Sequence, residues 1–468
     1  MKVDFNKLER AFNPKCLVVV GDKRSSNYMW LRGQKNFIGK LYSVQIDPDD
    51  IRGIKELGVP NYSSLMDIPE PIDLVIVAVP RAIAPAVLKD CIAKDVAAAQ
   101  FFTSGFTETA TKEGIEMESR LVKMAEDANF HLIGPNCVGI FNPRLGVRQN
   151  AEQYTGIEGS VGFISQSGAH ATNFSREGHF MGVDIKESVS FGNGVVLDSV
   201  DFLEYFAANP EIKVIGMYLE GIKDGRRFFE VLRKVTADKP VVIWKGGRTE
   251  EGERAISSHT GSLAMQQVIW DAVVRQCGAI KVTGQDEMID TMQALLYLEP
   301  VKGDRVGIAG GSGGQSVALA DIFAEAGLSV PPLSQQSYDE LLTFFSLIGG
   351  GFRNPIDTGN PNRLQMKRIM EILEDDANVD NLVLSITARM GTAEQLENDI
   401  TIMSELRSRT SKPLMVILST SFAPGAVKQS GDIIGKLQDS GLPVFVTPER
   451  GAQALHNVFS YFKNQRDD

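Results

Sequence analysis

Residues 213–247 read KVIGMYLEGIKDGRRFFEVLRKVTADKPVVIWKGG, and this stretch decides the fold class. It begins and ends with short apolar runs, KVIGMYLEG (213–221) and KPVVIWKGG (239–247), and each run closes on glycine. A helix-length amphipathic segment separates them. Apolar strands that alternate with helices in this way are typical of a parallel sheet. The stretch therefore predicts an α/β protein.

The same alternation continues through almost the whole chain. Further strand-like runs are CLVVVGD (16–22), DLVIVAVP (73–80), SVGFISQSG (160–168), DRVGIAGGSGG (304–314), NLVLSITA (381–388) and KPLMVILS (412–419). In such sheets, ligands bind outside the carboxyl ends of the strands. We therefore expect the functional residues to lie just after each strand.

Two breaks in the periodicity divide the chain into three α/β units. One break lies near 145–158, within NPRLGVRQNAEQYTGIEGS, and the other near 298–304, in LEPVKGD. We expect domains at 1–150, 151–299 and 300–468, each built on a doubly wound or flavodoxin-like parallel sheet.

Composition narrows the classes of partner. The 468 residues include 48 basic and 59 acidic side chains, a net charge of −11, and no Lys/Arg-rich run stands out. Nucleic acid and membrane surfaces are therefore not expected partners. The N-terminus lacks an apolar stretch of signal-peptide length, and four dispersed cysteines show no metal-binding spacing. We expect a cytoplasmic protein without disulfides or a bound metal.

The first unit lacks the dinucleotide fingerprint. DKRSSNY (22–28) follows the first strand-like run where GxGxxG would place glycines, which makes a nicotinamide dinucleotide a weak interpretation. Lys23 and Arg24 either meet the phosphates of a larger nucleotide or lie in a solvated loop. Later loops at strand ends are AVPRA with Pro80, TSGF with Thr103 and Ser104, and GPNCVG with Asn136 and Cys137.

Two strand-to-helix turns have the composition of anion-binding sites. SQSGAHATN (165–173) contains Ser167 and Gly168, and GIAGGSGGQSVALAD (307–321) contains Gly313 and Gly314. Small residues at a helix start allow backbone N–H groups to point at an anion. Taken singly, either stretch is equally an ordinary turn, so the more specific signal is the presence of two in one chain.

His259 is the candidate nucleophile. It is one of only five histidines and lies in AISSHTGSLA (255–264), among small polar residues. An imidazole can accept a phosphoryl group and pass it on. Glu220, in YLEG at the end of a strand, is a candidate for orienting that ring, although it could equally be a salt-bridge partner.

In this order, the segments resemble the α subunits of ADP-forming acetyl-CoA synthetases and, more distantly, of succinyl-CoA synthetase. The resemblance covers nearly the whole chain. Its strongest segments are PIDLVIVAVP, LIGPNCVGIFN, GFISQSGA, DFLEYFAANPEIKVIGMYLEGIKDGRRF, KPVVIWKGGRTEEGERAISSHTGSLA and NPIDTGN.

The resemblance implies a CoA-binding Rossmann-like domain followed by two succinyl-CoA-synthetase-like domains. It implies that His259 is phosphorylated, that Glu220 orients it, and that helix N-termini at Ser167, Gly168, Gly313 and Gly314 hold the phosphate. The CoA contacts it implies are Lys23, Arg24, Pro80, Thr103, Ser104, Asn136 and Cys137. The implied reaction interconverts acyl-CoA, ADP and phosphate with a carboxylic acid, CoA and ATP.

Three departures from the family pattern stand out. The first loop reads GDKRSSNYMW where relatives carry a sequence like GASRxPGxxG, and His170 replaces an apolar residue. The ATP-grasp module is missing, so ADP or ATP with Mg must bind a separate β subunit, and the resemblance implies an α2β2 assembly. The alternative is a CoA-sensing or scaffold protein that has lost ligase activity.

Overall fold

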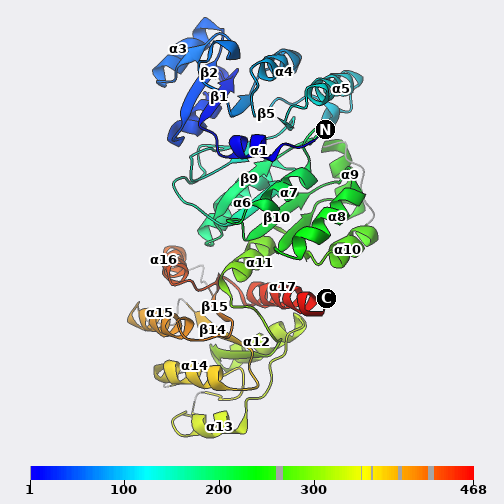
Figure 1. Cartoon of the computed structure of the whole chain (residues 1–468). Helices are drawn as coiled ribbons and strands as arrows, with labels where there is room; N and C mark the ends of the chain where they lie inside the picture. The colour runs from blue at the N-terminus through cyan, green and yellow to red at the C-terminus, as the bar shows by residue number, and fades with distance from the viewer. Residues whose placement is uncertain are drawn as a thin grey trace. The chain divides into compact units, whose positions relative to one another are not determined.

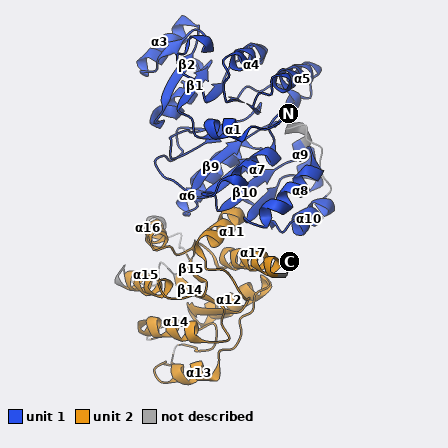
Figure 2. Cartoon of the chain, viewed as in Figure 1, with its two compact units in different colours: residues 1–285 blue, residues 286–468 orange. Residues whose placement is uncertain are grey.

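The computed structural model describes residues 2–259, 267–348, 350–359, 362–387, 393–419 and 426–467. It divides into two compact units, residues 1–285 and 286–468, coloured separately in Figure 2. The first unit contains two six-stranded sheets and the second a four-stranded sheet. The predicted fold class, α/β with three sheets that are wholly or mainly parallel, is confirmed.

The first sheet has the strand order of a dinucleotide-binding fold. Its order is β3-β2-β1-β4-β5-β6, and all neighbours are parallel. The strands are β1 (Cys16–Val20), β2 (Lys40–Val44), β3 (Asn61–Tyr62), β4 (Leu74–Val77), β5 (Ala98–Phe101) and β6 (Leu132–Ile133). The order reverses between β1 and β4, and a ligand crevice forms at such a switch point.

The second sheet has the flavodoxin-like order with one added strand. Its order is β12-β11-β10-β8-β9-β7, and only β7 is antiparallel to its neighbour. The strands are β7 (Gly139–Phe141), β8 (Val161–Ser165), β9 (Ile185–Ser190), β10 (Val214–Leu219), β11 (Val241–Lys245) and β12 (Ile280–Val282). The switch point lies between β8 and β10, so the segments after Ser165 and Leu219 share one edge.

The third sheet repeats this design within the second unit. Its order is β13-β14-β15-β16, with β13 (Val306–Gly310), β14 (Asn381–Thr387), β15 (Leu414–Ser419) and β16 (Val444–Phe445). A parallel bridge from Ala309 to Ile356 adds a short segment on the other side of β13. The glycine-rich turn after β13 therefore also begins at a switch point.

Helices connect the strands (Figure 1). In the first unit they are α1 (Phe5–Phe12), α2 (Met29–Gly33), α3 (Pro48–Glu56), α4 (Ala84–Ala93), α5 (Lys112–Asp127), α6 (Gly168–Phe180), α7 (Ser199–Ala208), α8 (Gly225–Thr236), α9 (Glu250–His259) and α10 (Gln267–Gln276). From the end of that unit onward they are α11 (Gln285–Tyr297), α12 (Gly313–Glu325), α13 (Gln335–Leu342), α14 (Met366–Asp375), α15 (Ala393–Arg407), α16 (Ala426–Asp439) and α17 (Pro448–Asp467).

The N-terminal helix ties the first unit together. The ring of Phe12 in α1 lies 4.9 Å from Tyr205 and 5.4 Å from Phe206, both in α7. Phe12 is fully buried, and an aromatic side chain of this size contributes about 2–3 kcal/mol when it is removed from water. The core of this unit is therefore continuous beneath both sheets.

Candidate functional site

A hollow of about 370 Å³ lies at the switch point of the first sheet. Four of the residues predicted to contact CoA line it, namely Lys23, Pro80, Thr103 and Ser104. The other lining residues are Gly21, Asp22, Ser26, Met29, Trp30, Ala78, Val79, Arg81 and Phe102. These side chains follow β1, β4 and β5, where the sequence analysis expected functional residues to lie.

Asp22 fills the position where a dinucleotide-binding fold would hold phosphate. Its Oδ2 accepts hydrogen bonds from the backbone N–H groups of Trp30 (3.0 Å) and Leu31 (2.9 Å), in the first turn of α2. Its Oδ1 accepts from the N–H of Lys23 and the hydroxyl of Ser26, both at 3.0 Å. Burial raises the pKa of the Asp22 carboxyl. The chain's own carboxylate thus occupies the start of this helix.

The remaining predicted CoA contacts lie around this hollow rather than in its lining. The backbone N–H of Arg24 donates to Asp50 Oδ1 at 2.9 Å, and the N–H of Asn136 donates to the Thr103 carbonyl at 3.0 Å. Cys137 is 3% exposed, and burial raises the pKa of its thiol to about 12. Any contact from Cys137 would therefore come from its backbone.

The lining residues fit the chemistry of CoA. Lys23 offers positive charge for phosphates, and no ion pair to it is found among the described residues. Arg81 also lines the hollow, but its guanidinium is paired with Glu113 at 2.6 Å. Trp30 and Phe102 pack edge to face with ring centres 5.0 Å apart, and Phe102 is 39% exposed. This apolar wall suits an adenine or pantetheine surface. The sequence analysis missed Arg81, although AVPRA pointed to its loop.

The first of the two predicted anion-binding turns is a capped helix start, as the SQSG sequence predicted. Ser165 ends β8, and its hydroxyl accepts from the N–H of Ser167 at 3.1 Å. Ser167 is the N-cap of α6, where its hydroxyl accepts from the N–H of His170 at 3.4 Å. A Cβ on Gly168 would lie 3.0 Å from Val138 Cγ1, so a larger residue would be crowded there. This turn carries no acidic side chain.

Glu220 lies across the same switch point, directly after β10. It is 5% exposed, and its Oε1 accepts from the Tyr218 hydroxyl at 3.3 Å. Its Oε2 is buried and has no hydrogen-bond partner among the described residues. A buried carboxylate oxygen without a donor costs free energy, which indicates that a polar group belongs beside it.

Two further side chains, both missed by the sequence analysis, hold the backbone at Glu220. Gln166 Oε1 accepts from the N–H groups of Glu220 (2.5 Å) and Gly221 (3.0 Å). Lys245, which is 2% exposed, donates to the Glu220 carbonyl at 2.9 Å, and burial lowers the pKa of its ammonium group. Gln166, which follows β8, and Lys245, which ends β11, thereby hold the backbone of Glu220 in place.

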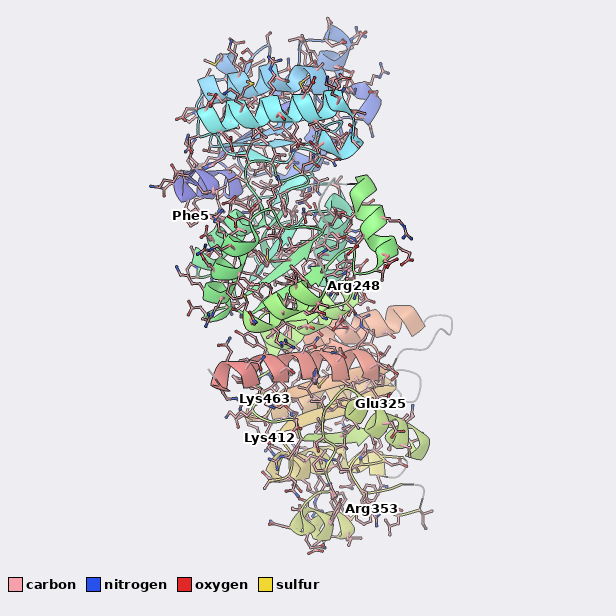
Figure 3. The ribbon with its side chains drawn as sticks, turned by 90° about the vertical axis from the view of Figure 1, so that its right-hand side faces the viewer. Phe5, Arg248, Glu325, Arg353, Lys412 and Lys463 are labelled. Atoms are coloured by element: carbon pink, nitrogen blue, oxygen red, sulfur yellow. The ribbon has the colours of Figure 1, made fainter. Side chains whose placement is uncertain are left out.

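His259 is the last residue of α9, and its side chain lies outside the described part of the structure, as do residues 260–266. Arg248, labelled in Figure 3, lies between β11 and α9, and its guanidinium donates to the Thr283 carbonyl at 2.8 Å. Cα atoms of α9 come within 8 Å of the short helix η5 (Thr107–Thr109), which follows Ser104. The phosphohistidine remains a prediction.

The second predicted anion-binding turn lies in the second unit. Gly310 has φ +112°, and a Cβ there would lie 2.1 Å from the Ser385 carbonyl, so the turn requires glycine. Ser312 and Gln315 form a capping box at the start of α12. A Cβ on Gly313 would lie 3.3 Å from Asp357 Oδ2, whereas Gly314 faces open space.

Neither a metal-binding cluster nor a membrane-spanning helix is found in the parts of the chain that the structure describes. There, no group of three or more His, Cys, Asp or Glu side chains could hold a metal ion. No described helix is both long and apolar enough to cross a membrane.

Comparison with known families matches two segments of the chain. Residues 18–143 match the CoA binding domain family, and residues 158–295 match the succinyl-CoA ligase like flavodoxin domain. The fold and these matches define a CoA-binding protein of the succinyl-CoA ligase type.

Relatives that match nearly the whole chain identify its family more closely. The chain is 34% identical to the α subunit of acetate–CoA ligase [ADP-forming] II of Pyrococcus furiosus, over 98% of both chains. It is 33% identical to acetate–CoA ligase [ADP-forming] I of Archaeoglobus fulgidus, over 97% of this chain and 64% of that one. The chain belongs to the ADP-forming acetate–CoA ligase family.

A solved structure agrees with this assignment. The dinucleotide forming acetyl-coenzyme A synthetase 1 of Ca. Korarchaeum cryptofilum, in complex with phosphate and ADP, superposes with a TM-score of 0.83. The two chains are 28% identical, over 98% of this chain and 97% of that one.

Proposed function

We propose that this chain is the CoA-binding, phosphohistidine-carrying α subunit of an ADP-forming acyl-CoA synthetase. It interconverts acyl-CoA, ADP and phosphate with a carboxylic acid, CoA and ATP. The observation that carries the proposal is the switch point of the second sheet. There, an uncharged capped turn at Ser167 and Gly168 faces Glu220, which has one buried oxygen without a partner in the described structure.

The chemistry begins with phosphate at this turn. Phosphate attacks the thioester, an acyl phosphate forms, and CoA leaves. The backbone N–H groups at Gly168 offset the negative charge, and a helix N-terminus contributes about 0.3–1 kcal/mol, rising to 2 when partly buried. Gly313 and Gly314 provide a second turn of this kind at α12.

His259 then takes the phosphoryl group, and the carboxylic acid is released. In this step Glu220 orients the imidazole and stabilises its positive charge. The phosphohistidine passes its phosphoryl group to ADP on a separate ATP-grasp subunit, which also binds Mg. The full assembly would be α2β2 and would work in the cytoplasm.

CoA binds at the first sheet in this proposal. Lys23 and Arg24 meet its phosphates, while Pro80, Thr103, Ser104, Asn136 and Cys137 supply the loop surface around it. Because Asp22 already fills the start of α2, the basic side chains rather than that helix carry the charge compensation. Domains at 1–150, 151–299 and 300–468 complete the proposed organisation.

The test is ATP synthesis by the complex of this chain with an ATP-grasp subunit from the same organism. ADP and phosphate are supplied with a panel of acyl-CoAs that includes acetyl-CoA, and His259→Ala is compared with the wild type. We expect the variant to lose turnover and to bind CoA with unchanged affinity in calorimetry. Near-normal turnover of the variant would remove His259 from the mechanism. A wild type that binds CoA but makes no ATP from any acyl-CoA would favour the CoA-sensing alternative.

A further inference from the structure

His170 lies in the first turn of α6, at the proposed phosphate position. Its backbone N–H donates to the Ser167 hydroxyl, which places the residue within one turn of the N-cap. No hydrogen bond from its ring nitrogens is found among the described residues. The resemblance noted in the sequence analysis implies an apolar residue at this position, whereas this chain has an imidazole.

Two aromatic rings, Tyr218 and Trp244, hold His170 beside Glu220. The His170 ring centre lies 4.3 Å from that of Tyr218 and 4.5 Å from that of Trp244, and the latter two are 4.7 Å apart. Tyr218 also donates its hydroxyl to Glu220, whose second oxygen is buried without a described partner. The imidazole, the helix start and the carboxylate therefore border one location.

The charge state of His170 suits proton transfer. Burial lowers its pKa, and Glu220, directly after β10, opposes that shift. The other neighbours are Tyr218, whose pKa burial raises, and the uncharged Trp244 on β11. His170 is therefore neutral near neutral pH, so one ring nitrogen accepts a proton while the other donates.

We propose that His170 is a second catalytic histidine, which is not phosphorylated and which carries a proton from phosphate to the departing CoA thiolate. The inference rests on the proposed function. When an oxygen of hydrogen phosphate attacks the thioester, a new O–C bond to the acyl carbon forms and the C–S bond breaks. The proton on the attacking phosphate moves to His170, which then gives it to the thiolate sulfur. No other reactant is needed, and the imidazole returns to its starting state.

The same helix contains a matched control. His179 lies near the end of α6, where its Nδ1 is 2.6 Å from Asp184 and its ring stacks on Tyr154 at 4.0 Å. The His179 ring is therefore engaged by Asp184 and Tyr154, at the opposite end of α6 from Ser167. His179→Gln therefore tests the effect of a similar change in α6 away from the switch point.

The experiment separates two half-reactions of the full chain. The first is phosphate-dependent release of CoA from acetyl-CoA, and the second is labelling of His259 by acetyl phosphate. We expect His170→Gln to slow the first by about 10²-fold or more and to leave the second near the wild-type rate. His259→Ala should show the reverse pattern, and His179→Gln should match the wild type in both.

A pH profile and chemical rescue complete the test. Wild-type CoA release should rise with pH through the lowered pKa of His170, and His170→Gln should lack that limb. Added imidazole should restore release by His170→Ala. Wild-type release by His170→Gln, or an equal loss of both half-reactions, would overturn the proposal. A wild type inactive in the first half-reaction would instead overturn the proposed function, and this inference with it.

Discussion

The first and second sheets each have a strand-to-helix turn at the switch point, but the two turns satisfy the N–H groups at the helix start differently. After β1, the Asp22 carboxylate accepts two backbone N–H groups of α2, so the chain provides its own anion. After β8, Ser167 accepts a single N–H group of α6 through an uncharged hydroxyl. If phosphate binds at α6 as proposed, topology alone does not make a phosphate site, because an acidic side chain at the turn would compete with the phosphate.

The largest expected effect comes from a substitution at Glu220. Among the residues that line the first hollow, Asp22 is the acidic side chain to compare with it. Glu220→Gln keeps the size of the side chain and removes its charge. We expect phosphorylation of His259 to slow by about 10²- to 10⁴-fold, because the imidazole loses its orienting carboxylate. Rapid-quench labelling measures this rate. An unchanged rate would leave Glu220 with a structural role only.

The next largest effect is expected when the turn after β8 is given a carboxylate like that of Asp22 in the turn after β1. Ser167→Asp places a carboxylate at the N-cap of α6, where Asp caps a helix as well as Ser does. We expect the KM for phosphate to rise by about 10- to 100-fold, because two negative charges would compete for one helix start. Ser167→Asn, a neutral cap of the same size as Asp, is the control. Equal phosphate KM values for the Asp and Asn variants would contradict the comparison.

The smallest effect concerns stability at the first turn. Asp22→Asn retains one acceptor oxygen and leaves two of the four donors unmatched, which we expect to cost about 1–3 kcal/mol of unfolding free energy at pH 7. Asp47→Asn, a neutral substitution at the N-cap of α3, should change stability little because Asn also caps well. Urea unfolding measures both.

The pH dependence of the unfolding free energy, compared between the wild type and Asp22→Asn, gives a second test. Burial raises the pKa of Asp22 above its ordinary value of 3.8, so the folded state holds this proton more tightly than the unfolded state. The wild type therefore loses stability as pH rises from 3.8 through the raised pKa. Asp22→Asn does not titrate and should lack this loss. Parallel stability curves for the two proteins would contradict the burial of this charge.

Much of this architecture could be predicted from sequence. Apolar runs that end in Gly, Ser or Pro identified the main strands, because a strand buried on both faces needs continuous apolar residues. The helix start at Ser167 followed from small polar residues after such a run. Tyr218 could also have been linked to Glu220, because residues two apart on a strand share a face.

Other features depend on tertiary contacts that no local pattern records. Asp22 reaches amides eight and nine residues further along the chain, which only the loop conformation allows. The packing of His170 on Trp244 joins α6 to β11, more than 70 residues apart. The support that Lys245 gives to Glu220 crosses between neighbouring strands. Such contacts require the three-dimensional structure.

The most direct test of the central claim is to find the phosphoryl group. The purified chain is incubated with labelled phosphate and a panel of acyl-CoAs, and peptide mapping locates any acid-labile label. We predict label on His259 and none on His170, with the best acyl donor defining the substrate class. No label from any donor, even with the ATP-grasp subunit and ATP present, would contradict the account.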